Sequence, residues 1–220
     1  MSRALRIDVA FDFVCPWCLI GKRQLKRAVV QLQQTHPHQV VSINWQSVQL
    51  LPQLPAAGEP FAEFYRRRLG SDTAVHLRQA QVQEAGAEVD LRFDFQRIAR
   101  MPNTADAHRL MRRAVELGGP EQRERLLERL FAAHFRHGED IGDANTLLTI
   151  AETCGYPREE MARALYRDGR PLQTPDTAAS SVPQFVFDGR LLLSGAQPAD
   201  LLLRGMREAL GFPERRRLQA

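Results

Sequence analysis

Apolar and polar residues alternate near the N-terminus of this 220-residue chain, which is the pattern of a β-strand with one buried face. The apolar positions are Leu5, Ile7, Val9, Phe11 and Phe13. The alternation breaks at Cys15-Pro16, and proline suits the first turn of a helix because its missing N–H would have no partner there. The pattern therefore predicts a strand that is followed directly by a helix.

From Leu19 the apolar residues recur at spacings of three and four, which predicts an amphipathic helix. Its apolar face holds Leu25, Ala28, Val29 and Leu32, and its other face holds Lys22, Arg23, Lys26 and Arg27. A second strand is expected over residues 40–48, with Val41, Ile43 and Trp45 on one face. Strand, helix and strand in this order predict a right-handed βαβ unit with a parallel pair of strands.

The middle of the chain has a helical pattern almost throughout, after a Pro/Gly-rich stretch at residues 51–60. Helices are expected at residues 61–69, 73–85, from Asn103 or Thr104 to 117, 120–137, from a cap at Asp143 to 154, and 157–167. The prediction is an inserted helical domain at residues 59–177.

The strand pattern returns near the C-terminus, after Ser180. Residues 185–187 and 191–193 predict a hairpin on the two-residue turn Asp188-Gly189, and Pro198 opens a last helix that ends near Leu210. We therefore predict an α/β fold in which residues 1–58 and 178–220 form one domain around the insert.

The candidate chemistry lies where the first strand meets the first helix, in the sequence Cys15-Pro16-Trp17-Cys18. The free N–H groups and the dipole at a helix N-terminus favour a thiolate over a thiol. A thiolate attacks disulfides, and a second cysteine one helical turn later can resolve the mixed disulfide. We expect Cys15 to be the nucleophile and Cys18 the resolving thiol.

A CxxC pair is also half of a zinc site, so metal binding is the alternative. The sequence has no second CxxC and no close pair of histidines, and a site would need distant Cys154 or one of six scattered histidines. Pro16 and Trp17 also stiffen the turn between the cysteines. The strand–CxxC–helix context favours redox chemistry, and no metal is expected.

Several other residues have two interpretations. Trp17 is either an exposed spacer or a shield for the disulfide. Asp12 is either an ordinary residue at a strand end or a proton acceptor for the resolving thiol. For His108 and Arg109, a solvated or core-capping role is favoured over ligand contact. Cys154 continues an apolar stripe, which predicts a buried residue rather than a third redox thiol.

Three segments resemble the DsbA-like thioredoxin family, specifically its FrnE branch. They are residues 13–22, residues 102–104 with 107–110, and residues 182–190 with 194–198, which together span nearly the whole chain. The resemblance implies a thioredoxin-like fold with a large all-helical insertion. It also implies kinship with 2-hydroxychromene-2-carboxylate isomerase.

The resemblance assigns roles that the residues alone do not. On its own, Pro183 is a trans proline at a strand start. The resemblance implies a cis proline beside the active-site disulfide, with Val182 offering its backbone to the substrate and Asn103 facing the groove. The sequence departs from the family at residues 168–181, where Ser181 replaces the usual glycine.

Composition excludes some function classes. The chain has 30 basic and 26 acidic residues, a balance that does not imply nucleic-acid binding, and the arginines at 215–217 are expected to be a solvated tail. It has no run of 18 apolar residues, so no membrane span is expected. No signal peptide is expected either, which predicts a cytoplasmic protein. In a reducing compartment a CxxC pair is catalytic or redox-sensing.

The primary hypothesis is a thiol–disulfide oxidoreductase that exchanges disulfides with protein or small-molecule thiols. It needs no cofactor beyond the Cys15–Cys18 disulfide, with glutathione a candidate co-substrate. One alternative is a glutathione-dependent isomerase or transferase of the kappa-like class, although such enzymes need a single nucleophile-stabilising residue and not a dithiol. A non-enzymatic alternative is a redox sensor or metal-binding adaptor.

Overall fold

The computed structural model describes residues 3–173 and 181–212, so the arginines at 215–217 and the expected boundary at 177–178 lie outside the described residues. The chain divides into two compact units. We call residues 1–11, 17–48 and 177–220 the sheet unit, and residues 12–16 and 49–176 the helical unit. The expected boundary after residue 58 lies inside the helical unit. Gln49 belongs there because its side chain contacts Asn103 and the Leu172 N–H.

The sheet unit is built on four strands in the order β2-β1-β5-β6. They are β1 (Leu5–Phe11), β2 (Val41–Ser47), β5 (Gln184–Phe187) and β6 (Leu191–Ser194). The predicted parallel βαβ unit is confirmed, because β1 pairs with β2 in parallel, Ile7 opposite Ile43. Strand β5 runs antiparallel to both β1 and β6.

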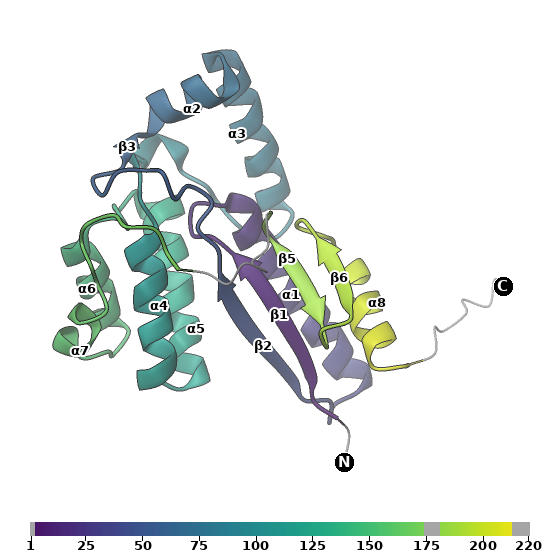
Figure 1. Ribbon diagram of the computed structural model, residues 1–220. Helices are drawn as coiled ribbons and strands as arrows, with labels where there is room; N and C mark the ends of the chain where they lie inside the picture. Colours follow the sequence, from purple (N-terminus) through teal and green to yellow (C-terminus); the bar gives the residue numbers. More distant parts are fainter. Residues whose placement is uncertain (1–2, 174–180, 213–220) are drawn as a thin grey trace. The chain divides into compact units, whose positions relative to one another are not determined.

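Helices α1 (Pro16–Thr35) and α8 (Ala199–Ala209) pack on the sheet (Figure 1). Alternate residues of β1 and β5 and the apolar faces of both helices form one core. The core consists of Leu5, Ile7, Val9, Leu25, Ala28, Leu32, Phe185, Phe187, Ala199, Leu202, Leu203 and Met206. The apolar spacings that predicted β1 and α1 are those that place these residues on one side of each element.

The C-terminal hairpin forms with the predicted turn on Asp188-Gly189, but one further residue, Arg190, also lies between the strands. Phe187 pairs with Leu191, so three residues separate the strands. Asp188 and Gly189 have the positive φ values of 50° and 70° that such turns require, and the Arg190 N–H donates to the Phe187 carbonyl. The Asp188 carboxylate accepts the Arg6 N–H, which ties the turn to β1.

The helical unit contains the helices that the sequence predicts for the middle of the chain. They are α2 (Phe61–Leu69), α3 (Asp72–Ala87), α4 (Ala105–Leu117), α5 (Pro120–Ala132), α6 (Ala144–Thr153) and α7 (Arg158–Ala162). The pattern did not reveal the short antiparallel pair β3 (Glu59–Pro60) and β4 (Arg100–Met101) or the 3₁₀ turn η1 (Phe95–Arg97).

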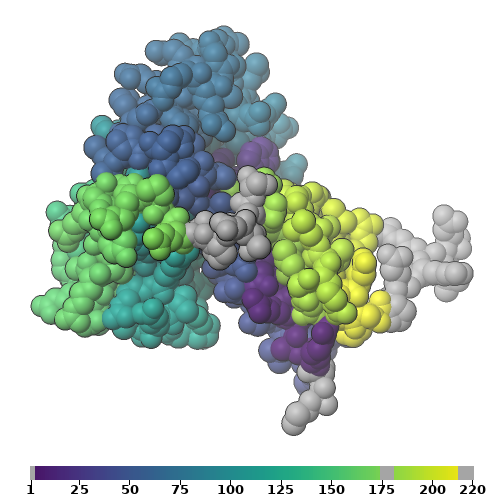
Figure 2. Space-filling view, in the orientation of Figure 1, coloured from purple at the N-terminus to yellow at the C-terminus, as the bar shows by residue number. Residues whose placement is uncertain are grey.

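Two of the predicted helices end earlier than expected. The segment expected at 120–137 is α-helical only to Ala132 and continues as a π-helical turn, η2 (Ala133–His137). Helix α7 ends at Ala162 instead of Arg167, because the Asp106 carboxylate accepts the N–H groups of Tyr166 and Arg167. The segment after α7, residues 163–173, lies at the surface of the helical unit (green in Figure 2).

Within residues 3–173 and 181–212, no helix is both long and apolar enough to cross a membrane.

A Gly21→Ala variant should be less stable, by about 1 kcal/mol, although alanine favours helices by a similar amount. A Cβ at position 21 would lie 3.0 Å from the Phe185 ring and 3.2 Å from the Pro183 ring. Both rings are held in place by the sheet unit, so overpacking outweighs the gain in helix propensity. Urea denaturation measures the difference.

The matched control is Gln34→Ala, at an exposed position of the same helix, which should change the stability by less than about 0.5 kcal/mol. A Gly21→Ala protein at least as stable as the wild type would contradict the prediction. It would show that the Phe185 and Pro183 rings move to accommodate the added methyl group.

Candidate functional site

The two cysteines of the CxxC sequence lie at the start of α1. The chain leaves β1 at Phe11 and enters α1 at Pro16, and the four residues between them carry Cys15. The Cys15 N–H donates to the Asp12 carbonyl at 3.2 Å, which closes a tight turn. Cys15 and Cys18 are not joined in a disulfide, and both are buried. The strand–CxxC–helix arrangement predicted from the sequence is confirmed.

Asp12 is completely buried in the helical unit. One carboxylate oxygen lies 3.1 Å from Nε2 of His108, and the other accepts the Leu50 N–H at 2.8 Å. Burial of a carboxylate requires such partners, because its desolvation is costly. Asp12 is therefore not an ordinary residue at a strand end. It is a buried polar group three residues before Cys15.

His108 is also completely buried, so of the two roles favoured by the sequence the core role is the one observed. Its ring packs on Phe13 at a centroid distance of 4.9 Å, and Phe13 in turn packs on Phe131 at 5.3 Å. The sequence did not indicate its contact with Asp12, because 96 positions separate the two residues.

His134 is a buried residue of the helical unit that the sequence did not single out. It lies in the π-helical turn η2, where such irregular turns often mark functional sites. Its side chain packs edge-on against Phe135, and neither ring nitrogen has a hydrogen-bond partner among the described residues. Burial lowers its pKa to about 4, and the charge of Asp12 opposes this shift only in part. His134 is therefore neutral at pH 7.

Tyr65 of helix α2 is a second residue that the sequence did not reveal. Burial raises the pKa of its phenol to about 12, and the negative charge of Cys15 adds to the shift. Its ring packs against Phe61 and Phe64 on the same helix. Tyr65 thus presents a neutral phenol in the electrostatic neighbourhood of Cys15.

Asn103 is buried and is engaged by the backbone of its own unit. Its amide nitrogen donates to the carbonyls of Leu54 and Gly169, and its oxygen accepts the Ala105 N–H at the start of α4. Of the two predicted caps, Thr104 holds the N-cap position without a side-chain bond, and Asn103, one residue earlier, bonds the first N–H of the helix. Asn103 also lines a cavity of the helical unit.

Arg109 is buried too, in an ion pair with Asp106 at 2.7 Å. Its guanidinium also donates to the carbonyls of Arg170 and Pro171. Arg109 therefore anchors the segment after α7, which agrees with the core role favoured by the sequence.

The peptide bond between Val182 and Pro183 is cis, as the family resemblance implies. The Pro183 carbonyl accepts the Gly195 N–H at 2.8 Å, and Ser181 accepts a hydrogen bond from Gln184. These contacts place the cis bond directly before β5, within the sheet unit.

The remaining residues singled out from the sequence are Pro16, Trp17 and Cys154. Pro16 occupies the first position of α1, and Trp17 follows it half-buried. Cys154 is buried as predicted, and burial raises the pKa of its thiol. A thiol in that environment is less reactive. Across the described residues, no three histidine, cysteine or acidic side chains come together in a way that could hold a metal ion.

Comparisons with known proteins agree with this arrangement. Residues 6–207 match the family model of the DSBA-like thioredoxin domain. The protein YwbO of Bacillus subtilis, described as uncharacterized, is 23% identical over 210 residues, which cover 90% of this chain and 93% of YwbO.

Two solved structures share the fold. A probable DsbA oxidoreductase from Streptomyces coelicolor superposes with a TM-score of 0.79 at 23% identity, covering 98% of this chain and 93% of its own. The cytosolic disulfide reductase DsbM from Pseudomonas aeruginosa, solved with GSH, has a TM-score of 0.56 at 19% identity, covering 94% of this chain and all of its own.

A His134→Leu variant should resist acid better than the wild type. The folded state holds the His134 pKa near 4, below the ordinary 6.5. Below pH 6.5 the unfolded chain therefore takes up a proton that the folded chain does not. The wild type should lose about 3 kcal/mol of stability between pH 6.5 and 4 through this group alone. Leucine removes that loss, and urea denaturation from pH 4 to 7 measures it.

The control is His76→Gln on the exposed face of α3, whose stability should follow the wild-type pH profile. Parallel pH profiles for wild type and His134→Leu would contradict the prediction.

Proposed function

We propose, from the fact that this chain belongs to the DSBA-like thioredoxin domain family, that it catalyses thiol–disulfide exchange through Cys15 and Cys18. The observation that carries the proposal is the position of the pair: Cys15 directly precedes a 20-residue helix, and Cys18 lies in its first turn. The N-terminus of a helix is the position in which reactive CxxC cysteines are commonly found.

The exchange proceeds in two displacements. The Cys15 thiolate attacks one sulfur of a substrate disulfide, the substrate S–S bond breaks, and the departing thiolate takes a proton. The Cys18 thiol then loses its proton and attacks the Cys15 sulfur, which releases the second substrate thiol. The substrate is reduced by two electrons, and the protein is left with a Cys15–Cys18 disulfide. Two external thiols restore the dithiol, and the same steps in reverse oxidise a substrate.

Asp12 is our candidate for the group that takes the proton from the resolving thiol. It is buried, lies three residues before Cys15, and its carboxylate is held by His108 and the Leu50 N–H. A carboxylate and an imidazole in contact can share one extra proton without exposure to water. His108 therefore acts through Asp12, as a positioning residue.

The substrate contact is assigned to the segment that carries the cis bond. Val182 precedes Pro183, and its backbone is our candidate for pairing with an extended substrate chain. Trp17, between the cysteines, supplies apolar surface beside the disulfide. Asn103 serves this proposal only indirectly, because its amide is bound to the backbone of the helical unit.

Glutathione is the small thiol that we propose as co-substrate. The neighbour DsbM was solved with GSH and is described as a cytosolic disulfide reductase. The chain has only three cysteines in 220 residues, which suits a reducing compartment. In such a compartment a CxxC dithiol is catalytic and not a structural disulfide. One alternative is a glutathione transferase or isomerase with a single nucleophile. Such an enzyme does not need Cys18, so the presence of Cys18 favours dithiol chemistry.

Substitution of the two cysteines should separate the two steps. Cys15→Ser should lower insulin reduction with dithiothreitol by at least about a hundredfold, because serine is a far weaker nucleophile. Cys18→Ser keeps the nucleophile and should accumulate a mixed disulfide, visible by mass spectrometry. Cys154→Ser, at a buried and less reactive thiol, is the matched control and should keep the wild-type rate.

Full activity in Cys15→Ser would exclude the proposed nucleophile. Catalysis that survives in Cys18→Ser and depends on glutathione would favour the glutathione-dependent transferase or isomerase. A glutathione redox titration of the wild type gives the direction: about −270 mV is a reductase value and about −120 mV an oxidase value.

Asp12→Asn should slow the resolving step by about a hundredfold at pH 7, the usual contribution of a proton acceptor. Stopped-flow oxidation by glutathione disulfide, followed by tryptophan fluorescence, resolves the attack of Cys18 on the mixed disulfide. Asp8→Asn is the matched control, because Asp8 is a buried carboxylate of β1 that bonds to Arg6 and Asn44. Equal rates for wild type and Asp12→Asn from pH 5 to 9 would remove Asp12 from the mechanism.

A further inference from the structure

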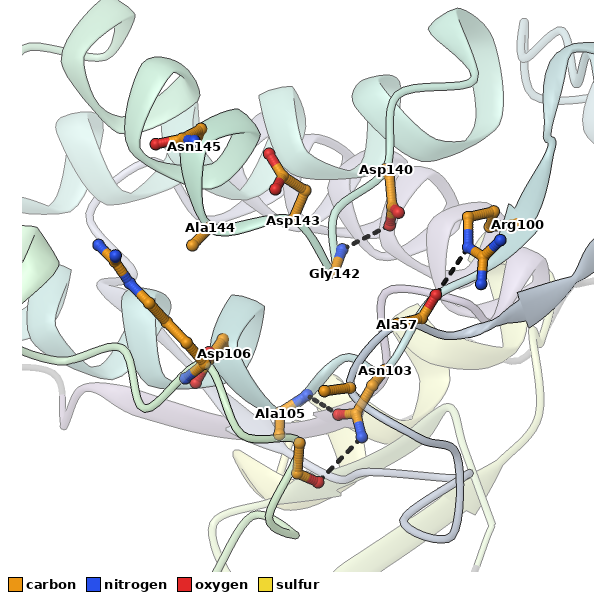
Figure 3. A pocket seen from close by; sticks show the side chains of 13 residues that line it. Ala57, Arg100, Asn103, Ala105, Asp106, Asp140, Gly142, Asp143, Ala144 and Asn145 are labelled. Carbon is orange, nitrogen blue, oxygen red and sulfur yellow. Dashed lines mark hydrogen bonds between the residues drawn. The ribbon is translucent and has the colours of Figure 1, made fainter.

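A cavity of about 600 Å³ lies within the helical unit, and charges of both signs line it (Figure 3). Arg100 comes from β4, Arg167 from the segment after α7, and Asp140 and Asp143 from the turn before α6. Small-molecule sites commonly have volumes of this order. Among the described residues that line the cavity there is no cysteine, so it is distinct from the CxxC pair.

Arg167 presents an uncommitted cation to this cavity. Its backbone has a φ of 61°, which is uncommon outside glycine, and its N–H donates to Asp106 at 2.8 Å. Asp106 is itself fixed by its ion pair with Arg109. The guanidinium of Arg167, in contrast, has neither a hydrogen bond nor an ion pair with any other described residue. The fold therefore holds the backbone of Arg167 in place and leaves its charge unused.

Asp140 and Asp143 each use only one of their two carboxylate oxygens in hydrogen bonds with described residues of the protein. One oxygen of Asp140 accepts the Gly142 N–H at 2.9 Å, and one oxygen of Asp143 accepts the Thr146 N–H at 2.7 Å as the cap of α6. Within the described part of the chain, the second oxygen of each carboxylate accepts no hydrogen bond. Nor does any ion pair there join either aspartate to Arg100 or Arg167. The charges around the cavity are thus left for a ligand.

Arg100 is more constrained than Arg167, but it still carries its charge. It donates to the carbonyls of Ala57 and Gly58, and Figure 3 shows it on the same side of the cavity as Asp140, with Asp106 across from them. The Arg167 N–H donates to Asp106, which lies across the cavity from Arg100. The two arginines therefore belong to different sides of the cavity wall. A ligand can therefore meet charges of both signs at once.

We infer that this cavity binds a small zwitterion with a primary ammonium and a carboxylate, a free amino acid or short unblocked peptide. A simple anion would be attracted by the arginines and repelled by Asp140 and Asp143, and a simple cation would meet the reverse. A zwitterion satisfies both sets, and charge-assisted hydrogen bonds are the strong ones. Arg167 takes the carboxylate, and Asp140 and Asp143 take the ammonium.

The inference does not depend on the thiol chemistry proposed above, and its first test uses no thiol. Calorimetric titration of the full chain with trialanine should give saturable binding with a dissociation constant of about 1 mM or lower. N-acetyl-trialanine amide lacks both charges and should bind at least about tenfold more weakly. Alanine added alone distinguishes a free amino acid from a peptide as the preferred source of the zwitterion.

Two variants test the assignment of the charges. Arg167→Gln and Asp140→Asn should each weaken trialanine binding about tenfold or more. Arg92→Gln removes an exposed arginine of the same unit outside the cavity and should bind like wild type. In Asp140→Asn, the asparagine side chain can still accept the Gly142 N–H, so this substitution preserves the turn before α6.

Three results would overturn the inference. The first is the lack of saturable trialanine binding, and the second is equal binding by wild type and Arg167→Gln. The third is inorganic phosphate binding as tightly as trialanine, which would make the cavity an anion site.

Discussion

A carboxylate that is shut away from water must find partners within the protein, and Asp12 finds them on two distant segments. His108 of α4 and the backbone of Leu50 hold its two oxygens. The removal of one partner from such a buried charge typically costs about 3–5 kcal/mol. The short connector that carries Cys15 is therefore fixed to the helical unit at the same point where the chain leaves β1. These two contacts of Asp12 help to fix the position of the nucleophile, whose N–H bonds to the Asp12 carbonyl.

Asp106 solves a similar problem elsewhere in the helical unit. Its carboxylate accepts two backbone N–H groups from the irregular segment after α7 and pairs with Arg109, which reaches carbonyls of the same segment. Irregular backbone at a protein surface needs such partners, because it lacks the internal bonding of a helix. Two buried aspartates thus shape the parts of the unit that its helices do not.

The sequence predicted the regular parts of the fold well, because they follow from periodicity. Apolar spacing placed β1, α1 and β2, and it found every α-helix of the helical unit. It did not find the early end of α7, the three-residue hairpin connection or the contact of Asp12 with His108. Each of these depends on one side chain meeting backbone or a partner far away in sequence, which no local pattern encodes. His134 and Tyr65 were missed for the same reason, since burial is the main cause of their altered pKa values and no local pattern encodes it.

The pairing of β1 has a consequence for the order of assembly on the ribosome. One edge of β1 meets β2 within the same βαβ unit, but the other edge waits for β5, where Ile7 pairs with Phe187. During synthesis β1 therefore keeps one edge of unpaired N–H and C=O groups open until residues 184–187 of β5 have been made. Such an edge is a template for pairing with other chains. A nascent chain of this topology is most exposed to aggregation while the helical insert is being translated.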